Sequence, residues 1–342
     1  MNPDSCSDCS SISPQAIHRR AFLQKAGLAA GGVTAGGILT GRAAQPMAAN
    51  PIRPNSETLV KTFYDSLSEE QRGKICFGFD HDLRLKVDNN WHITKTLVQD
   101  FTRDQQEMIR KIFIGLHSEE YAQKVYNQVQ HDSGKRGFAG GSSVAIFGEP
   151  GTGKFQFVLT GRHCTRRCDG DSVAGASFGG PIFYGHAADG FREGPDHKGN
   201  AYWYQALRAN EVYQMLDGKQ REAALLDTSR GEHGNDTVRL TGKKQGLEGI
   251  RMAELAGDQK DHVMKVVGDL LAPFREQDAA EAIKHITAGG TDNLHLAFYK
   301  DENIGEDEVW DTWQIEGPNC IFYFRGKPHV HAWMHVKDPK AV

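Results

Sequence analysis

The C-terminal end of the chain alternates between apolar and polar side chains in four short segments, and this alternation constrains the fold more than any other feature. A period of two is typical of β-strands, whose successive side chains point to opposite faces of a sheet. The turn-forming sequences Gly317-Pro318-Asn319 and Gly326-Lys327-Pro328 separate the last three segments, and connections this short join antiparallel neighbours. We therefore predict antiparallel strands over residues 294–299, 310–316, 320–324 and 329–336.

Helix starts recur through the rest of the chain. Ser, Thr or Asp followed three residues later by Gln forms a capping box, in which each side chain hydrogen-bonds an unpaired amide at the start of a helix. We interpret these boxes as helix starts and not as a sign of a repeat architecture. They begin at Ser68, Thr102 and Asp217, with a weaker version at Gly257.

The order of these patterns predicts the fold class. Helices are expected over about 201–226 and 258–288, with Gly289 and Gly290 ending the second region. Central strands are expected over 144–147, 155–160 and 172–178. Because strands and helices are segregated along the chain, we predict an α+β fold in which helices pack on a mainly antiparallel sheet. Residues 57–342 are expected to form a single domain.

The N-terminus resembles a twin-arginine export signal. Arg19-Arg20, with Phe22-Leu23 close behind, precedes a Gly- and Ala-rich apolar run over 26–40 that is too short for a stable membrane span. We expect a signal peptide over 1–49, a linker over 50–56, export by the twin-arginine translocase, and a soluble product in the periplasm or outside the cell. The net charge of −4 argues against nucleic acid as a partner.

A phosphate-loop pattern occurs at 148–154 (GEPGTGK), but we interpret it as a hairpin loop. A phosphate loop continues with Ser or Thr for Mg²⁺ and opens a helix. Here Phe155 occupies that position, and the residues after it alternate as a strand. We therefore predict no nucleotide cofactor.

Four cysteines remain beyond the signal peptide: Cys76, Cys164, Cys168 and Cys320. If residues 164–168 form a strand, the two cysteines at its ends lie roughly 13 Å apart, too far for a disulfide. We expect structural thiols, although a turn after Cys168 leaves its pairing open.

Two histidines on the last predicted strand suggest a metal site. His329 and His331 share a face and lie roughly 6.5 Å apart along the strand, so both imidazoles can bind one ion. His163 is the first candidate for a third ligand, since it would end the apolar face of the strand that begins at Phe155, and His186 is the second. His335 should lie outside the site, because it is roughly 13 Å beyond His331.

Short blocks in the right order resemble a known family, the domain-of-unknown-function family 3500. They are 67–72 (LSEEQR), 77–80 (FGFD), 147–150 (FGEP), 161–163 (GRH), 315–318 (IEGP) and the final His-x-His strand. The likeness covers about 57–337, and Arg162 replaces a histidine of the family's central block. The resemblance implies a related fold and a habit of export, but no reaction.

Two functions are compatible with these features. The first is an exported metalloprotein in which His163, His329 and His331 hold Zn²⁺, Cu²⁺ or Fe²⁺, serving hydrolysis or oxidoreduction of a small molecule. In that case Glu316 or Glu193 is the candidate general base. The second is a non-catalytic binding or scaffold protein of the cell envelope, with structural histidines on a half-buried edge strand.

Overall fold

The structure of the protein, a computed structural model, describes residues 55–186, 201–301, 303, 309–326 and 329–342. The signal peptide predicted over 1–49 lies outside the described residues. The linker predicted over 50–56 ends earlier than expected, because Ser56 already begins a helix and Asn55 caps it. All described residues fall within one compact unit.

The described chain divides into two halves with similar elements. In chain order the first half contains α1 (Ser56–Asp65), α2 (Glu69–Ile75), β1 (Cys76–Phe77), α3 (Arg103–Gly115), α4 (Glu119–Asp132), α5 (Gly137–Gly141), β2 (Ser142–Gly148), β3 (Phe155–Gly161), β4 (Cys164–Cys168) and β5 (Ile182–His186). The second half contains α6 (Tyr204–Met215), α7 (Gly218–Ala224), β6 (Leu225–Leu226), β7 (Ile250–Arg251), α8 (Gly257–Leu271), α9 (Glu276–Gly289), β8 (His295–Tyr299), β9 (Thr312–Glu316), β10 (Cys320–Arg325) and β11 (Val330–Val336).

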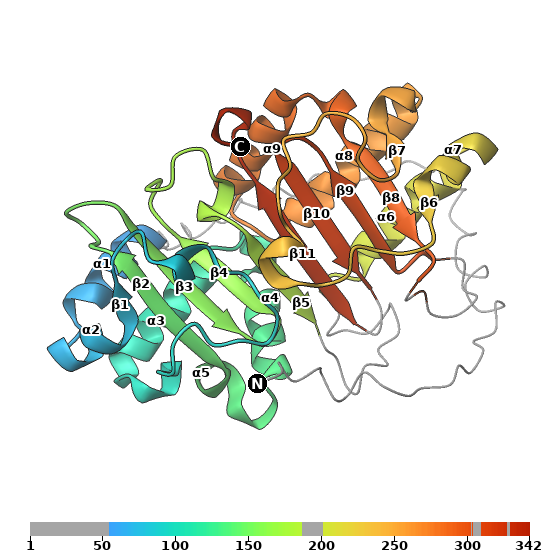
Figure 1. Cartoon of the computed structure of the whole chain (residues 1–342). Helices are drawn as coiled ribbons and strands as arrows, with labels where there is room; N and C mark the ends of the chain where they lie inside the picture. The colour runs from blue at the N-terminus through green and yellow to red at the C-terminus, as the bar shows by residue number, and fades with distance from the viewer. Residues whose placement is uncertain (1–54, 187–200, 302, 304–308, 327–328) are drawn as a thin grey trace, which may run out of the picture. The chain divides into compact units, whose positions relative to one another are not determined.

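These strands form one sheet of 11 strands (Figure 1). Their order is β1-β2-β3-β4-β5-β11-β10-β9-β8-β6, and β7 pairs with β8. The pairs β1–β2 and β6–β8 are parallel, while the other pairs between these strands are antiparallel. The α+β class is therefore confirmed, and the sheet is mainly antiparallel but mixed.

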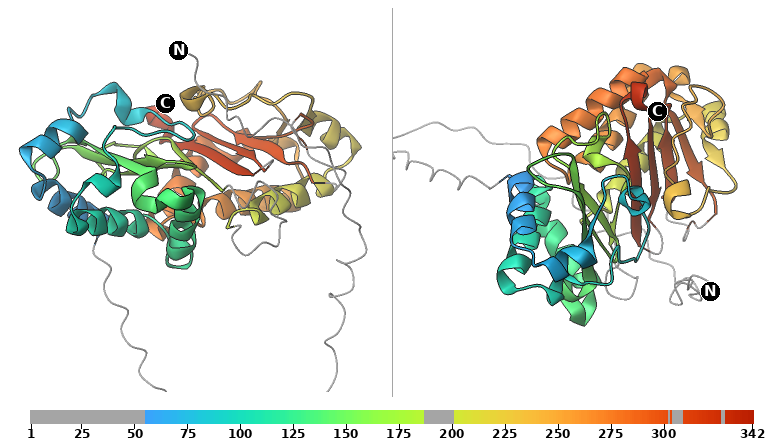
Figure 2. Two further views of the ribbon diagram at one scale, coloured as in Figure 1. Left: turned by 90° about the horizontal axis from the view of Figure 1, so that it is seen from below. Right: turned by 60° about the vertical axis from the view of Figure 1, so that its left-hand side comes forward.

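Helices cover one face of the sheet, and long loops cover the other (Figure 2). Alternate side chains of each strand serve the two faces. Met334 of β11 packs in the main apolar core, which also contains Val267 of α8. Trp333, the preceding residue, points the other way and packs with Val87 and Val238 of the loops. Burial on both faces explains why these strands carry large apolar side chains throughout.

The two halves repeat one order of elements. The sheet is symmetric about the β5–β11 pair, and the outermost strand of each half, β1 or β6, follows a seven-residue helix, α2 or α7. A pair of helices then precedes an antiparallel meander in each half, with α3 and α4 before β2, and α8 and α9 before β8. The two outer parallel pairs complete the correspondence.

A sparse sequence pattern accompanies this repeat. Arg72 stacks on Tyr64 and donates a hydrogen bond to its carbonyl oxygen, and Arg221 does the same to Tyr213. The capping boxes before α2 and α7 thus occupy equivalent positions, and the interpretation that they mark helix starts alone is wrong. Four residues recur at the same spacing: Tyr64, Leu67, Gln71 and Arg72 match Tyr213, Leu216, Gln220 and Arg221.

Two predictions about strands need correction. Residues 172–178 do not form a strand, because Gly175 and Phe178 take positive φ values of 71° and 57°. The strand that pairs in this region is β5, which lies further along the chain. The last strand, β11, is not an edge strand, since β5 and β10 flank it on both sides.

The prediction of a hairpin in place of a phosphate loop is confirmed. Gly148 of β2 pairs with Phe155 of β3, so residues 149–154 are the connecting loop. Gly148 has a φ of 74°, and a Cβ there would collide with the carbonyl oxygen of Lys154. The glycine therefore serves the turn. The four cysteines predicted to be thiols are all free, with Cys164 and Cys168 at opposite ends of β4.

Candidate metal centre

His329 immediately precedes β11 and His331 is the second residue of that strand, which lies in the middle of the sheet. His331 pairs with Gly185 of β5 and with Arg325 of β10. The Nε2 atoms of the two histidines are 2.9 Å apart, so the predicted shared face is confirmed. It is the face of Trp333, which the loops cover.

His163 reaches the same point from the turn between β3 and β4. Gly161 pairs with Cys164, which leaves Arg162 and His163 as the two turn residues. His163 has a φ of 53°, a left-handed conformation that histidine adopts more readily than most residues. The sequence prediction had placed His163 on a continuing strand. The strand ends at Gly161 instead, and the turn brings the imidazole of His163 against those of His329 and His331.

The three imidazoles converge on one point. Nε2 of His329 lies 3.0 Å from Nε2 of His163 and 2.9 Å from Nε2 of His331. A tetrahedral ion bound at about 2.0–2.1 Å holds its ligand nitrogens about 3.3 Å apart, close to these separations. All three residues are buried. Among the described residues, this is the one group of three or more histidine, cysteine or acidic side chains with such geometry.

Two buried carboxylates orient two of these rings. Nδ1 of His163 lies 2.9 Å from Oδ2 of Asp132 at the end of α4. Nδ1 of His331 lies 2.8 and 2.9 Å from the two oxygens of Glu232, which lies in the loop between β6 and β7. An ionised carboxylate only accepts hydrogen bonds, so Nδ1 of His163 must carry the proton. The two oxygens of Glu232 favour the same tautomer in His331, whose Nδ1 is also approached by Arg325. This carboxylate–histidine pairing is typical of metal ligands.

The tautomers fix what the opposite nitrogens can do. With Nδ1 protonated, Nε2 of neutral His163 and of neutral His331 each present a lone pair. Both lone pairs point at Nε2 of His329, which carries at most one proton and can therefore satisfy only one of them. A cation at this point would accept all three nitrogens, so the donor set fits a divalent transition metal.

Burial keeps the three imidazoles neutral near neutral pH. It lowers the pKa of His163 despite the opposing charge of Asp132. It lowers the pKa of His331 to about 3, with a further contribution from Arg325. Burial and the two neighbouring histidines also lower the pKa of His329 far below its usual value. Neutral imidazole is the form that binds metal.

Glu232 is held in place by more than His331. Nε1 of Trp333 donates to it at 2.9 Å, and Arg325 forms an ion pair with it at 3.1 Å. Burial alone would raise the pKa of Glu232, but the contacts with His331, Arg325 and Trp333 outweigh burial and keep the pKa below its usual range. The carboxylate therefore stays ionised.

The second half of the chain builds the same turn without the ligands. A Gly-x-Asn-Cys turn joins β9 to β10 where a Gly-x-His-Cys turn joins β3 to β4, so Asn319 stands in place of His163. Gly289, the last residue of α9, stands in place of Asp132, the last residue of α4. Asn319 fills the space above Gly289 and donates to the carbonyl oxygen of His285.

Comparison with protein-family models identifies the family to which the chain belongs. A family model described as "protein of unknown function (DUF3500)" matches residues 53–339. The chain belongs to the DUF3500 family. No curated protein and no solved structure matches it. Within the described part of this DUF3500 chain, no helix has the length and apolar character needed to span a membrane.

His186, the other candidate ligand, lies beside the DUF3500 site and not within the group of three. Its Nδ1 is 3.7 Å from Oδ1 of Asp132, the carboxylate that also orients His163. His186 ends β5 on the helix-covered face, opposite to the face of His331. The fold thus places it next to a supporting carboxylate.

Sequence patterns gave no indication of Asp132 or Glu232. The general base suggested from sequence, Glu316, forms an ion pair with Arg230. It is opposite Ile321 of β10, whereas His331 is opposite Arg325. Four residues of strand separate these rows, roughly 13 Å, so Glu316 is too far from the histidines to act there. The other suggestion, Glu193, lies outside the described residues.

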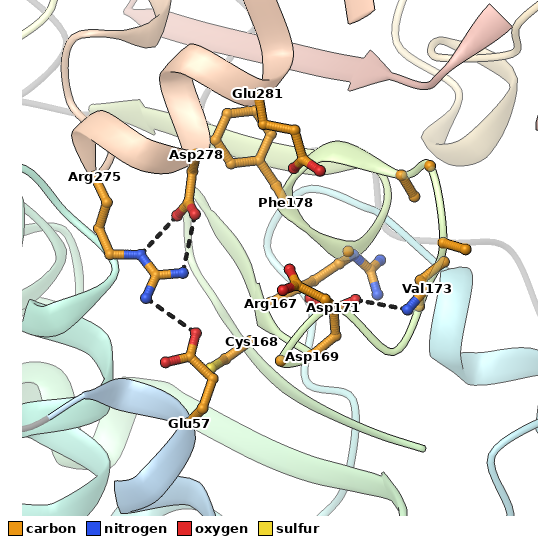
Figure 3. A pocket seen from close by; sticks show the side chains of 15 residues that line it. Glu57, Arg167, Cys168, Asp169, Asp171, Val173, Phe178, Arg275, Asp278 and Glu281 are labelled. Atoms are coloured by element: carbon orange, nitrogen blue, oxygen red, sulfur yellow. Dashed lines mark hydrogen bonds and ion pairs between the residues drawn. The ribbon is translucent and has the colours of Figure 1, made fainter. Parts of the chain in front are cut away.

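A separate acidic pocket lies between α1, α9 and the loop after β4 (Figure 3). Arg275 bridges Glu57 at 3.0 Å and Asp278 at 2.8 Å. Asp169 accepts a hydrogen bond from the amide of Val173, and burial raises its pKa to about 6. The cavity volume of about 90 Å³ is far below the roughly 300–1,000 Å³ of small-molecule sites. We interpret the ion pairs of Arg275 as contacts that hold α1 against the start of α9.

Proposed function

We propose that this DUF3500 protein is an exported metalloprotein that binds one divalent transition metal through His163, His329 and His331. One observation carries the proposal: three buried Nε2 atoms converge within 3.0 Å of the central one, while carboxylates hold the opposite nitrogen of two rings. Three histidines that only packed against one another would not need a buried carboxylate, Asp132 or Glu232, beside two of the rings.

The repeat supports a role in function over a role in folding. The second half forms an equivalent turn with Asn319 and Gly289, where the first half has His163 and Asp132. The scaffold therefore folds at this turn without a histidine or a carboxylate. A role of His163 and Asp132 in function, and not in folding, accounts for their presence in the first half alone.

Three histidine nitrogens without a thiolate suit Zn²⁺, Cu²⁺ or Fe²⁺. An ion held by three nitrogens has room for a further ligand and supplies a Lewis acid or, for copper and iron, a redox centre. Hydrolysis and oxidoreduction of a small molecule are therefore the two reaction classes that we propose.

Export completes the proposal. The twin-arginine pair Arg19-Arg20 precedes an apolar run, as in signals read by the twin-arginine translocase. That route carries folded proteins, which would allow the metal to be inserted before export. We propose the periplasm or the exterior as the place of action.

Elemental analysis of protein purified without an affinity tag tests the metal centre. Wild type should contain close to one equivalent of Zn, Cu or Fe. The variant His163→Ala and the double variant His329→Ala/His331→Ala should lose it. The matched control is His335→Ala, on the same face of β11, which should keep the metal.

Circular dichroism of each variant separates loss of metal from loss of fold. A wild type that is folded and metal-free, and that takes up none of the three metals when they are added, would contradict the proposal. The histidines would then be structural, and a binding or scaffold function would remain.

A further inference from the structure

A second cavity, an open cleft of about 390 Å³, lies between α3, α4 and α5. Its volume falls within the roughly 300–1,000 Å³ of small-molecule sites. Val98 and Phe138 supply buried apolar surface, and the ring of Tyr126 packs against that of Phe138 with 5.2 Å between their centroids. No histidine of the metal centre and no carboxylate that orients one lines the cleft. The cleft can therefore hold a small organic molecule independently of that centre.

Three arginines line the cleft. Arg103 and Arg110 belong to α3, and Arg136 lies in the turn between α4 and α5. Arg110 donates to the two oxygens of Glu107 at 2.7 and 2.8 Å, so this pair carries no net charge. Within the described part of the chain, the side chains of Arg103 and Arg136 form no hydrogen bond or ion pair. The cleft thus has two uncompensated positive charges, although the chain as a whole has a net charge of −4.

Local structure does not explain these two arginines. Arg103 is the first residue of α3, where the positive end of the helix dipole disfavours a cation. Arg136 lies in a turn bounded by Gly134 and Gly137, with left-handed φ values of 56° and 58°. A Cβ at Gly140 of α5 would come within 3.1 Å of Cβ of Arg136, so a glycine there makes room for the arginine. The turn is therefore shaped around a side chain that has no partner in the fold.

The repeat also forms without these arginines. We aligned α3 with α8 at the glutamines of their capping boxes, and α4 with α9 at their last residues. The second half then has no arginine at any of the three positions. The corresponding residues are Gly257, Met264 and Asn293. A role in binding accounts for the presence of the arginines in the first half alone.

We propose that the cleft binds a small phosphate monoester, with the phosphate on Arg103 and Arg136 and the organic part against Phe138 and Val98. A phosphate monoester carries about two negative charges at neutral pH and has three strong acceptor oxygens. Two guanidinium groups match that charge, and their forked N–H groups match its oxygens. A carboxylate carries one charge and would leave one guanidinium uncompensated.

Two more side chains favour the same group. Tyr126 and Gln130 line the cleft, and neither forms a side-chain hydrogen bond with another described residue. The hydroxyl of Tyr126 and the amide of Gln130 are donors, which a phosphate with several lone pairs can use alongside the arginines.

Calorimetric titration of full-length protein with phenyl phosphate tests the proposal. At about pH 8 this probe is a dianion, since the second pKa of such esters is about 6. Phenol is the neutral analogue, benzoate the singly charged one, and inorganic phosphate lacks the ring. Phenyl phosphate should bind at one site, about tenfold more tightly than benzoate or inorganic phosphate, because only it meets both arginines and the apolar surface. Phenol should give no heat of binding.

Matched variants assign the site. Arg103→Gln and Arg136→Gln should each raise the dissociation constant of phenyl phosphate about tenfold, and the corresponding lysine variants should recover part of the loss. Lys135→Gln makes the same change of charge at an exposed residue outside the cleft and should leave the affinity unchanged. Because a cation at the start of α3 is unfavourable, Arg103→Gln should not lower the urea midpoint of unfolding. A fall in affinity in that variant is then not a loss of fold.

The double variant His329→Ala/His331→Ala separates this site from the metal centre, and it should keep the affinity of wild type. A loss of binding in that variant would place the phosphate at the metal centre and overturn the inference. Failure of the metal proposal itself would leave the cleft untouched.

Other results would also overturn the inference. One is an affinity unchanged in both Arg103→Gln and Arg136→Gln, or lowered equally in Lys135→Gln. Another is benzoate or inorganic phosphate binding as tightly as phenyl phosphate. Cosedimentation with phosphatidylglycerol vesicles tests a lipid headgroup as the source of the phosphate. Vesicle binding that depends on the two arginines, without binding of phenyl phosphate, would exclude the small soluble ester.

Discussion

The carboxylate of Asp132 is completely buried, with 0% of its side chain exposed. Burial on its own would raise its pKa, but hydrogen bonds with His163 and His186 reverse the effect and keep the pKa below its usual value. The ionised group fixes which nitrogen of His163 carries the proton. One residue at a helix end thus sets both the direction of the imidazole and its tautomer.

Replacing this carboxylate should weaken metal binding without unfolding the protein. In Asp132→Asn the neutral amide is a poorer acceptor for Nδ1 of His163, so metal affinity should fall about 10- to 100-fold. Competition with a chromophoric chelator measures the change. The control is Asp261→Asn, an exposed position on α8. Equal affinities in wild type and Asp132→Asn would show that the carboxylate does not support the ligand.

His335 gives a pH dependence that is independent of the metal ligands. Its Nδ1 donates to the carbonyl oxygen of Val238 at 3.1 Å, and burial lowers its pKa to about 4. The unfolded chain has the ordinary histidine pKa of about 6.5. Between these values the unfolded state binds a proton that the folded state does not. The free energy of unfolding should therefore fall as the pH drops from about 6.5 to 4, and stay unaffected above 6.5.

The contribution of His335 is at most about 3 kcal/mol over this pH range. Urea unfolding of metal-free protein at pH 7, 5.5 and 4.5 should show a shallower decline for His335→Asn than for wild type. Other buried histidines contribute to the decline in both proteins, so the difference between the two curves is the quantity to compare. Parallel curves would mean that His335 is protonated equally in both states.

At the scale of residues, the sequence could predict the three candidate histidine ligands but not the carboxylates that orient them. The period of two in a strand places His329 and His331 together whatever the rest of the fold does. Asp132 is 31 residues from His163, and Glu232 is 99 residues from His331. No local pattern connects such pairs, because tertiary packing alone brings them together.

At the scale of elements, paired glutamines tie each short helix to its neighbour. Gln71 and Gln105 exchange two hydrogen bonds of 3.0 and 3.1 Å between α2 and α3. Gln220 and Gln259 exchange two of 3.0 and 2.8 Å between α7 and α8. Each pair fixes the helix that leads into an outermost strand, β1 or β6.

If the two halves are equivalent, breaking either glutamine pair should lower the free energy of unfolding by a similar amount. Gln105 and Gln259 are both buried, and their loss leaves amide partners unsatisfied. We expect Gln105→Ala and Gln259→Ala each to lower the free energy of unfolding by about 1–3 kcal/mol. Denaturant titration provides the measurement, with exposed Gln123→Ala of α4 as a control expected within about 0.5 kcal/mol of wild type. A large effect in one half alone would argue against equivalent roles.

Elements with strong periodicity were predictable, and the repeat was not. The last four strands follow from alternation and short turns. The region 172–178 has the composition of a strand, but Gly175 and Phe178 adopt positive φ values that end it. Equivalent buried positions of the halves carry different side chains, such as Val60 in α1 and Ala209 in α6. Packing tolerates such exchanges when neighbours adjust, so two halves with different buried residues can form the same arrangement of elements.

For the molecule as a whole, the proposed export by the twin-arginine route makes a direct prediction. Replacing both Arg19 and Arg20 with lysine should leave uncleaved precursor in the cytoplasm, because the translocase recognises the arginine pair. Cell fractionation and immunoblotting detect the precursor. Arg42→Lys, a conservative change beyond the apolar run, is the control and should be exported normally. Normal export of the double-lysine variant would rule out the twin-arginine route.

The three histidines come from different halves of the chain. His163 and Asp132 belong to the first half, while His329, His331 and Glu232 belong to the second. Along the sheet, the halves meet through β5 and β11. An ion bound at this boundary is therefore a crosslink that also makes unfolding cooperative, since neither half can open without releasing a ligand. With the ion removed, the halves stay joined through the β5–β11 pairing and a shared apolar core, but the crosslink is lost. We therefore expect the thermal transition to move to lower temperature and to broaden.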